Sequence, residues 1–511
     1  MKYLIGGCLL YGAIFFVLFW LRPKSKLHAM TLETFDRNKK IMTFTVMALL
    51  VLLCTIPMGI VPGWNGTEDN GRDEYELTAE AFLNGHLYID NNDVDPLLLT
   101  MENPYDPQAR LDLGVDYRWD TAYYNGHYYM YFGVVPVSLL FLPFRIITGT
   151  ALTTYHATQI FVAFFICGVF ANFYLLSKRF FKQISYAIYL LLAVAVSAMS
   201  VWYSVDCPAM YCTAITGALC MEIWSLFFFM RAVWVEQDEK KQILLAFFGS
   251  LFGALAFGCR PPVALANLFV IPLLVEYLRG KKFNFKLLKQ LVFAALPYVI
   301  VAVLLMWYNY ARFENPFEFG QAYQLTTADQ SNYGGISSYF TQSNMFRILN
   351  GVCYNFFYFN NYCEGLPYVI FNGILLNFPI LCFAVIGLSP EGVQKKLKEQ
   401  RMRAFVAMLF LIPLVIAVMD TLWSPFMTER YRMDQYWIMG VLCFIVIGFY
   451  HDNLSEEAGR KFSCFITIWA FVTFGKAVLL YLVQNDGNLT YCYPEVIEEI
   501  KMILKFGFGG N

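Results

Sequence analysis

The feature that most constrains this chain is a series of apolar segments, each long enough to cross a lipid bilayer. A membrane-spanning helix needs roughly 20 mainly apolar residues, and windows of that kind recur from one end of the 511-residue sequence to the other. Charged residues make up 15% of the chain, whereas a soluble protein carries roughly 25%. We therefore expect an all-α polytopic membrane protein, with about 12 transmembrane helices near residues 3–21, 41–61, 151–176, 184–204, 208–230, 242–259, 262–279, 288–310, 366–389, 404–420, 434–450 and 462–483.

One further apolar run, at 132–149, determines on which side of the membrane all later loops lie. Pro136 and Pro143 interrupt this run, so we expect amphipathic helices at the membrane interface there rather than a span. With that assignment, basic connections such as "RPKSKLHAMTLETFDRNKK" and "SPEGVQKKLKEQRMR" all fall on the cytoplasmic side, as the positive-inside rule requires. The two large loops, at about 62–150 and 311–365, then lie outside, as do the N-terminus and the C-terminal tail.

The chain divides into three parts within one membrane domain. Residues 1–40 are expected to form an extra N-terminal transmembrane helix and a cytoplasmic linker, because the apolar run is too long for a signal peptide and its basic residues follow it. Residues 41–310 form a core with the outer loop at 62–150, and residues 311–511 add the second outer loop, the remaining helices and an external tail.

Charge and cysteine usage exclude some functions. The net charge of −1 and the lack of a DNA-binding motif argue against a nucleic-acid partner. Most of the 13 cysteines lie inside apolar runs, where they act as small hydrophobic residues, and no zinc-ligand spacing appears. Cys353 and Cys363, in the second outer loop, are left open as a disulfide pair.

The first outer loop contains an acidic pair at the start of an amphipathic helix. Asp73 and Glu74 begin "DEYELTAEAFLNG", and the Asn84-Gly85 pair predicts its end. Asp73 followed by Glu76 fits a capping box, which is a structural role. A carboxylate at a helix N-terminus is also kept ionised by the helix dipole, as a general base requires. The sequence leaves both roles open for Asp73.

Other polar residues of the outer segments are candidates for substrate binding. The aromatic stretch "RWDTAYYNGHYYMYFG" contains Asp120, His127 and Tyr128; its rings are typical of headgroup-level anchors, although His127 would suit a phosphate contact. Arg260 lies where one span ends and the next begins with two prolines. An arginine at a helix end often only snorkels to the interface, yet the guanidinium also binds phosphate in a bidentate manner.

Two later segments contribute on the same side of the bilayer. "YNYARFENPFEFGQAYQL" contains Glu318, and "TERYRMD" contains Arg430 and Arg432. A transporter would instead place ionisable residues within its spans. Glu222 is the main acid inside a span, and we expect it to be a hydrogen-bonded structural group.

These residues resemble those of the C-type glycosyltransferase superfamily (GT-C), polytopic enzymes that use polyprenyl-phosphate sugars. The chain is most similar to the bacterial branch related to protein O-mannosyltransferases and aminoarabinose transferases. Four segments carry the resemblance, which covers roughly residues 41–450: "RDEYELTAEAFLNGHLYID", "YNGHYYMYFGVVPVSLLFLPF", "YNYARFENPFEFGQAYQL" and "TERYRMD".

The resemblance implies roles for several residues. Asp73 matches the general base, with Glu74 beside it, and Arg260 matches the arginine that holds the carrier phosphate. His127 stands where relatives often have lysine, which is a departure from the pattern. The implied reaction inverts the anomeric carbon: Asp73 deprotonates the acceptor, and Arg260 with Arg430 or Arg432 stabilises the departing polyprenyl phosphate.

The resemblance also implies surroundings for that reaction. The enzyme would act at the outer face of the plasma membrane, on an acceptor that is a glycan, a lipid or a protein. No nucleotide-sugar site is required and no cofactor is assigned with certainty; the acidic loop leaves room for a divalent metal without a ligand spacing that defines one. The alternative from another class is a secondary transporter or a lipid-carrier flippase without glycosyl transfer.

Overall fold

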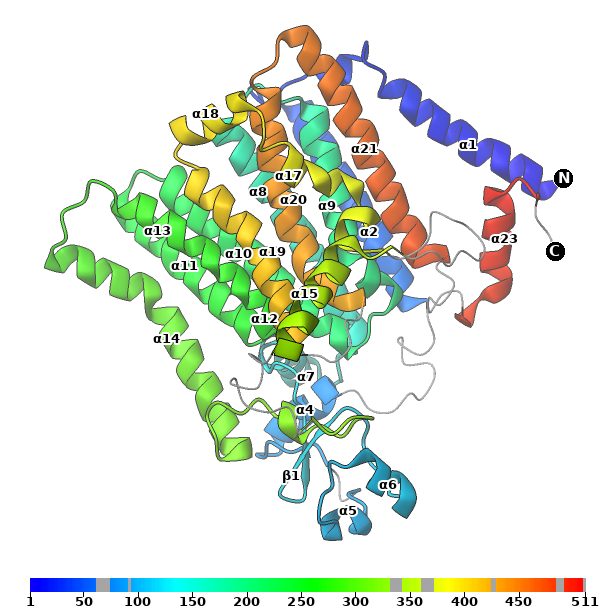
Figure 1. The fold of residues 1–511 in the computed structure, drawn as a ribbon, viewed down its shortest axis with the longest axis vertical. Helices are drawn as coiled ribbons and strands as arrows, with labels where there is room; N and C mark the ends of the chain where they lie inside the picture. Colours follow the sequence, from blue (N-terminus) through cyan, green and yellow to red (C-terminus); the bar gives the residue numbers. More distant parts are fainter. Residues whose placement is uncertain are drawn as a thin grey trace.

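The computed structural model describes residues 1–60, 74–90, 93–330, 342–359, 372–423, 429–483 and 491–508. In these residues it is a bundle of long helices with a small cap at one end (Figure 1). The long helices are α1 (Lys2–Trp20), α2 (Arg37–Thr55), α8 (Thr154–Phe180), α9 (Tyr186–Asp206), α10 (Met210–Trp234), α11 (Glu239–Phe257), α14 (Phe285–Phe313), α19 (Arg403–Trp423), α20 (Met433–His451) and α21 (Glu456–Val483).

Eleven helical segments of the described residues are long and apolar enough to cross a membrane. One of them is built from three consecutive pieces, α12 (Pro261–Ala264), η4 (Leu265–Phe269) and α13 (Val270–Leu278). They match the predicted spans apart from the window at 366–389, and they confirm an all-α polytopic membrane protein. The run at 132–149 forms only the short helical segment Val137–Thr148, made of η3 (Val137–Phe141) and α7 (Leu142–Thr148).

The predicted span at 366–389 is not a continuous helix in its described part. Residues 372–389 contain three one-turn pieces, α16 (Ile374–Asn377), η8 (Pro379–Cys382) and α17 (Phe383–Ile386). Phe378, directly before Pro379, has φ −128° and ψ 83°, because the proline ring excludes the helical conformation from the residue before it. The described part of this window is therefore broken into short helical pieces, so it is not among the eleven long apolar helices.

The centre of the bundle is α20, whose apolar window is 94% buried, whereas that of α14 is 17% buried. Helices α8, α9 and α10 pack around α20, and small residues let their backbones approach closely. A Cβ added to Gly440 would lie 2.5 Å from the side chain of Val196, and one added to Gly448 would lie 2.7 Å from that of Phe181. The apolar outer face of α14 is left for lipid.

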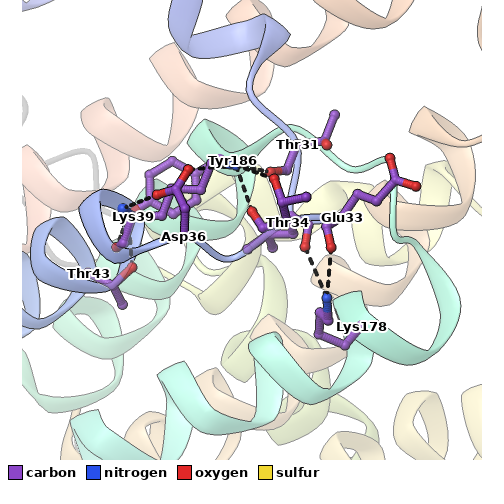
Figure 2. Close-up of polar contacts among 9 residues, drawn as sticks. Thr31, Glu33, Thr34, Asp36, Lys39, Thr43, Lys178 and Tyr186 are labelled. Carbon is purple, nitrogen blue, oxygen red and sulfur yellow. Dashed lines mark hydrogen bonds and ion pairs between the residues drawn. The ribbon is translucent and has the colours of Figure 1, made fainter.

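The connection 21–36, which joins α1 to α2, is held against the bundle by polar contacts (Figure 2). Lys39 is buried and donates to the carbonyl oxygens of Thr31 and Thr34, at 2.8 and 2.7 Å. Lys178 donates to the carbonyl oxygen of Glu33 at 3.0 Å. His28, in η1 (Lys26–Ala29), lies 2.8 Å from both the Leu21 carbonyl oxygen and Ser463 Oγ. The predicted linker is thus an ordered segment that is bound to the helix bundle.

The described part of the loop at 62–150, which we predict to lie outside, forms the cap at the lower end of Figure 1, and we call this end the hairpin end. It contains α4 (Glu74–Leu83), α5 (Pro96–Thr100), α6 (Pro107–Leu113) and an antiparallel hairpin of β1 (Ala122–Tyr124) and β2 (His127–Tyr129). Helix α18 (Glu391–Glu399), in a strongly basic connection, lies at the opposite end of the bundle. The other short elements are η2 (Ile56–Gly59), η5 (Gln321–Tyr323), α15 (Gln342–Phe357), η9 (Glu429–Arg432) and α23 (Pro494–Leu504).

Candidate functional site

A pocket with an empty volume of about 880 Å³ lies where the cap meets the ends of the helices. Its described walls come from residues 131–134 after the hairpin, the α11–α12 junction, the end of α14 and η9. Arg260, Arg312 and Arg430 line it, and no acidic residue is among the described lining residues. Guanidinium groups bind phosphate and carboxylate oxygens in a bidentate manner, so the pocket is built for an anion.

Arg260 enters the pocket from the first turn of a helix. It is the N-cap of α12, with φ −154°, and Pro261 and Pro262 occupy the first helical positions, where a missing N–H costs nothing. Its Nε donates to Asp434 of α20 at 2.8 Å, and Asp434 is fully buried. Asp420 of α19 also interacts electrostatically with Asp434 and Arg260. The two acids fix the direction of the guanidinium.

Arg312 enters from the last turn of α14, which ends at Glu314 in a left-handed conformation (φ 57°). Its side chain is buried, with Nη1 donating to the Met130 carbonyl oxygen at 2.5 Å and Nη2 to Asn309 Oδ1 at 2.9 Å. The guanidinium also lies 3.8 Å from the ring centroid of Tyr308. Arg312 therefore ties the cap to α14 while adding positive charge to the pocket wall.

Arg430, in η9, stacks over the ring of Tyr211 with 4.1 Å to its centroid. In the part of the chain that the structure describes, no carboxylate lies within ion-pairing distance of it. The hydroxyl of Tyr211 donates to Asp120, and so does the side-chain amide of Gln324. Asp120 is buried and sits at φ 60°. It thus acts on the pocket through Tyr211 rather than from its wall.

Burial raises the pKa of the Asp120 carboxyl above its ordinary value, while the hydrogen bond from Tyr211 and the charge of Arg430 oppose that rise. Burial likewise raises the pKa of the Tyr131 phenol, with the charge of Asp120 as a further cause. Both shifts follow from removing charged forms from water.

The predicted acidic pair is described in part. Asp73 lies outside the described residues. Glu74, the first residue of α4, is buried and accepts a hydrogen bond from Thr121 Oγ1 at 2.7 Å. Since Thr121 follows Asp120, the start of α4 is joined to the segment that holds Tyr211. The roles of Asp73 and Glu74 in catalysis stay predictions.

Four other predicted site residues do not line the pocket. His127 lies on the hairpin, with Nδ1 3.1 Å from Asp90, and Tyr128 is buried in the cap beside Tyr123. Glu318 accepts from the Gly320 N–H at 2.7 Å. Arg432 is buried and donates to the Tyr354 carbonyl oxygen at 3.4 Å, so Arg430 is the arginine of that pair which reaches the pocket.

Within the described residues, no three carboxylate, histidine or cysteine side chains lie together as a metal site would require. Cys353 is exposed, and its predicted partner Cys363 lies outside the described residues. The divalent metal and the Cys353–Cys363 disulfide therefore stay predictions.

Sequence reasoning missed two residues of this site. Arg312 lies in the segment "YNYARFENPFEF" that we singled out, and a lone arginine in the last turn of an otherwise apolar span is the signal that marks it. Tyr211, which links Asp120 to Arg430, lies in "DCPAMYCTAIT" and carries no signal of its own. Its role follows from the side chains that the fold brings to it.

The fold and the pocket define a multi-pass, all-α membrane protein with an arginine-lined anion pocket at one end of its helix bundle. No protein-family profile matches the sequence, and a search of curated proteins found no match.

Two groups of solved structures are similar to the chain. The structure of ArnT from Cupriavidus metallidurans bound to undecaprenyl phosphate has 14% identity and a TM-score of 0.42, covering 92% of this chain and 76% of that one. The Archaeoglobus fulgidus oligosaccharyltransferase has 14% identity and a TM-score of 0.40, covering 93% of this chain, and AglB from the same organism, in complex with an inhibitory peptide and a dolichol-phosphate, scores 0.41. This chain spans 57% of the length of those archaeal chains. Scores at this level assign no chemistry to the pocket.

Proposed function

We propose that this chain is a membrane glycosyltransferase that moves a sugar from a polyprenyl-phosphate carrier to an acceptor. The observation that carries the proposal is the convergence of Arg260, Arg312 and Arg430 on one pocket. These residues are far apart in the sequence, and only Arg260 has an ion-pair partner among the described residues, the buried Asp434, so an anion entering the pocket would offset the positive charge of Arg312 and Arg430. A lipid phosphate at the end of a membrane bundle supplies such an anion.

Apolar space beside the pocket supports a lipid-linked ligand. A second cavity, with an empty volume of about 930 Å³, runs between α11 and α14 and shares Phe257, Leu305, Asn309 and Phe319 with the arginine pocket. Most of its other walls are aliphatic or aromatic. A carrier with an anionic head and a long hydrocarbon tail fits this pairing of charge and apolar surface.

The proposed reaction is an inverting displacement at the anomeric carbon. Asp73 takes the proton of the acceptor hydroxyl or amine, and the acceptor atom forms its bond to carbon from the face opposite the phosphate. The carbon–oxygen bond to phosphate breaks, and its electron pair leaves with the polyprenyl phosphate. Arg260 and Arg430 stabilise the growing charge, and the Asp434 carboxylate holds Arg260 in the required direction. The active site would face the outside of the plasma membrane.

The first test removes the phosphate contact. We expect Arg430→Gln to weaken polyprenyl-phosphate binding at least tenfold in purified protein, because the charge that faces the pocket is lost. Arg401→Gln, at the opposite end of the bundle and ion-paired only at the surface, is the matched control. Equal binding by the wild type and the Arg430→Gln variant would remove the pocket from carrier recognition.

The second test addresses the base. Membranes supplied with a polyprenyl-phosphate sugar should lose transfer by about a thousandfold in Asp73→Asn, within the range that general-base catalysis contributes, while Asp73→Glu keeps part of the activity. Carrier binding should be unchanged in both variants. Uptake of free solute by proteoliposomes, without any glycosyl transfer, would favour the transporter instead.

A further inference from the structure

A third cavity lies toward the end of the bundle opposite the hairpin, and we call it the α13–α14 cavity. Its volume is about 830 Å³, and α10, α11, α13 and α14 all line it. Three of its polar residues mark that end: Gln242 lies in the first turn of α11, Tyr277 in the last turn of α13 and Gln290 in the second turn of α14. The volume falls within the range of about 300–1,000 Å³ that is usual for small-molecule sites.

The α13–α14 cavity opens sideways to the surface that faces lipid. Helix α14 packs against α11 and helix α13 against α10, so the cavity separates two helices that are neighbours in the sequence. Leu274 of α13 and Ala295 of α14 both line it and are both exposed. Most of the other walls are aliphatic or aromatic. A hydrocarbon chain can therefore enter from the bilayer between α13 and α14.

Two buried polar atoms of this wall have no hydrogen-bond partner among the described residues. They are the Tyr277 hydroxyl and Gln290 Oε1. The Gln290 side chain hydrogen-bonds with the Glu239 carboxylate, and because a carboxylate only accepts, this contact uses Nε2 and leaves Oε1 as a free acceptor. Buried polar atoms without partners are unfavourable, so the wall suits a ligand that has polar groups at one end.

Positive charge lies at the same end of the cavity. The segment 279–289, which joins α13 to α14, contains five basic residues and no acidic one. Lys286 is ion-paired with Glu239 at 2.6 Å. Lys281 makes no ion pair with any described residue, and its Nζ lies 3.2 Å from the ring centroid of Tyr277. An ammonium group is thus available beside the unpaired hydroxyl, which favours a ligand with an anionic group.

A hydrogen-bonded group separates the α13–α14 cavity from the apolar cavity beside the arginine pocket. Tyr298 lines both cavities. Its hydroxyl donates to Asn267 Oδ1 at 2.5 Å, and Asn267 Nδ2 donates to the buried Glu222 carboxylate at 2.5 Å. A polyprenyl tail that passed this group would bring only hydrocarbon to the lysines and unpaired polar atoms beyond it. The far cavity therefore suits a different lipid, which enters with its charged group at that end.

We propose that the α13–α14 cavity binds an anionic phospholipid from the bilayer leaflet at this end, which we predict to be the cytoplasmic one. One acyl chain lies between α13 and α14, and the phosphate lies beside Lys281 and accepts from the Tyr277 hydroxyl. A hydroxyl of the headgroup donates to Gln290 Oε1. Basic pockets between transmembrane helices hold anionic headgroups in this way on the cytoplasmic side. The inference does not depend on glycosyl transfer.

The test compares phosphatidylglycerol with phosphatidylcholine of the same acyl chains by native mass spectrometry of the purified full chain. The wild type should bind phosphatidylglycerol at least fivefold more tightly. Ala294→Phe fills the cavity and should abolish this binding, whereas Val299→Phe, on the exposed face of the same helix, should keep it. Lys281→Gln should remove most of the preference for phosphatidylglycerol. Lys461→Gln, ion-paired at the surface of α21, is its matched control and should behave as the wild type does.

A second variant tests the polar atoms without filling the cavity. Tyr277→Phe combined with Gln290→Leu keeps the shape of the wall, and it should weaken binding of phosphatidylglycerol about tenfold and that of phosphatidylcholine much less. The thermal midpoint of this double variant without added lipid should match that of the wild type, which shows that the chain is folded. Binding of phosphatidylglycerol to the folded double variant as strong as to the wild type would overturn the proposal.

The remaining outcomes separate this site from the donor site. Equal binding of the two phospholipids by the wild type, or undiminished binding by Ala294→Phe, would show that no anionic lipid is recognised in the cavity. Displacement of phosphatidylglycerol by polyprenyl phosphate would assign the cavity to the carrier tail and overturn the proposal. Arg430→Gln should keep phosphatidylglycerol whatever its effect on polyprenyl phosphate, so the failure of either assignment leaves the other standing.

Discussion

Arg430 and Arg432 show how much a residue's role depends on neighbours that the sequence does not reveal. They are two positions apart in η9 and chemically identical, yet Arg430 stacks on Tyr211 at the pocket and Arg432 is buried against Tyr354. Sequence reasoning could predict that arginines gather at this end of the bundle, because the spans and their charges fix it. It could not predict which of the two arginines lines the pocket, since their neighbours Tyr211 and Tyr354 come from distant helices.

Removing the Asp434 carboxylate should lower the stability of the protein, because Arg260 loses its ion-pair partner. Taking one partner from a buried ion pair costs about 3 kcal/mol, so we expect Asp434→Asn to lower the free energy of unfolding by roughly that amount in mixed micelles. The Arg260→Gln/Asp434→Asn double variant should recover part of the loss, because the charge of Arg260 that had lost the Asp434 carboxylate is then removed as well. Strictly additive effects of the two changes would show that the pair is not coupled.

Asp120 gives the protein a dependence on pH whose sign follows from burial. Its pKa is raised above 3.8 in the folded chain, so between 3.8 and the raised value the folded state binds more protons than the unfolded one. This contribution to stability is therefore greatest below 3.8 and falls as the pH rises through that window. Asp120→Asn removes the titrating group, and the difference in thermal midpoint between wild type and variant should change with pH in this window. A difference that stays constant with pH would contradict the assignment.

At the scale of the element, hydropathy located the spans well. It did not predict the features that depend on proline and on backbone conformation, namely the break at 366–389 and the hairpin. The predicted span at 366–389 contains Pro379, and its described part breaks into single turns. The hairpin was present in the sequence as Asn125-Gly126, a pair typical of a tight turn, and these residues have φ 51° and 82°. From the sequence we assign that stretch interfacial aromatic anchors and candidate binding residues but no hairpin, because its rings dominate its composition.

A substitution of Gly133 tests how the cap packs against the α11–α12 junction. A Cβ at this position would lie 2.2 Å from the Gly258 carbonyl oxygen and 2.4 Å from that of Cys259, and these are backbone atoms directly before Arg260. Gly133→Ala should therefore destabilise the protein by about 2–3 kcal/mol, at the upper end for overpacking, and weaken polyprenyl-phosphate binding with it.

The matched control is Gly475→Ala in α21, where nothing lies within 4 Å of the added Cβ. Alanine favours the helix there by up to about 1 kcal/mol over glycine, so this variant should be as stable as the wild type or more so. Equal stability of Gly133→Ala and wild type, measured by thermal unfolding, would mean that the cap does not rest on the α11–α12 junction as described.

At the scale of the whole molecule, the first and last described helices pack together and the two ends of the bundle differ in charge. Lys2 is ion-paired with Glu499 at 2.6 Å, and the Tyr11 hydroxyl donates to the Leu504 carbonyl oxygen at 2.7 Å, so α1 and α23 form one peripheral pair (Figure 1). Acidic residues gather in the cap, while the connections at the opposite end contain most of the lysines. From the positive-inside rule we predict that the hairpin lies outside.

This orientation can be measured directly with single cysteines and a membrane-impermeant maleimide on intact cells. In a background in which the exposed residues Cys8 and Cys353 are replaced by serine, Asn125→Cys at the hairpin turn should be labelled from outside. Lys281→Cys, in the connection between α13 and α14, should react only after the cells are permeabilised. Since Arg260, Arg312 and Arg430 line a pocket directly beneath the hairpin, labelling of Lys281→Cys but not Asn125→Cys in intact cells would place that pocket on the cytoplasmic face, where a carrier displayed outside cannot enter it.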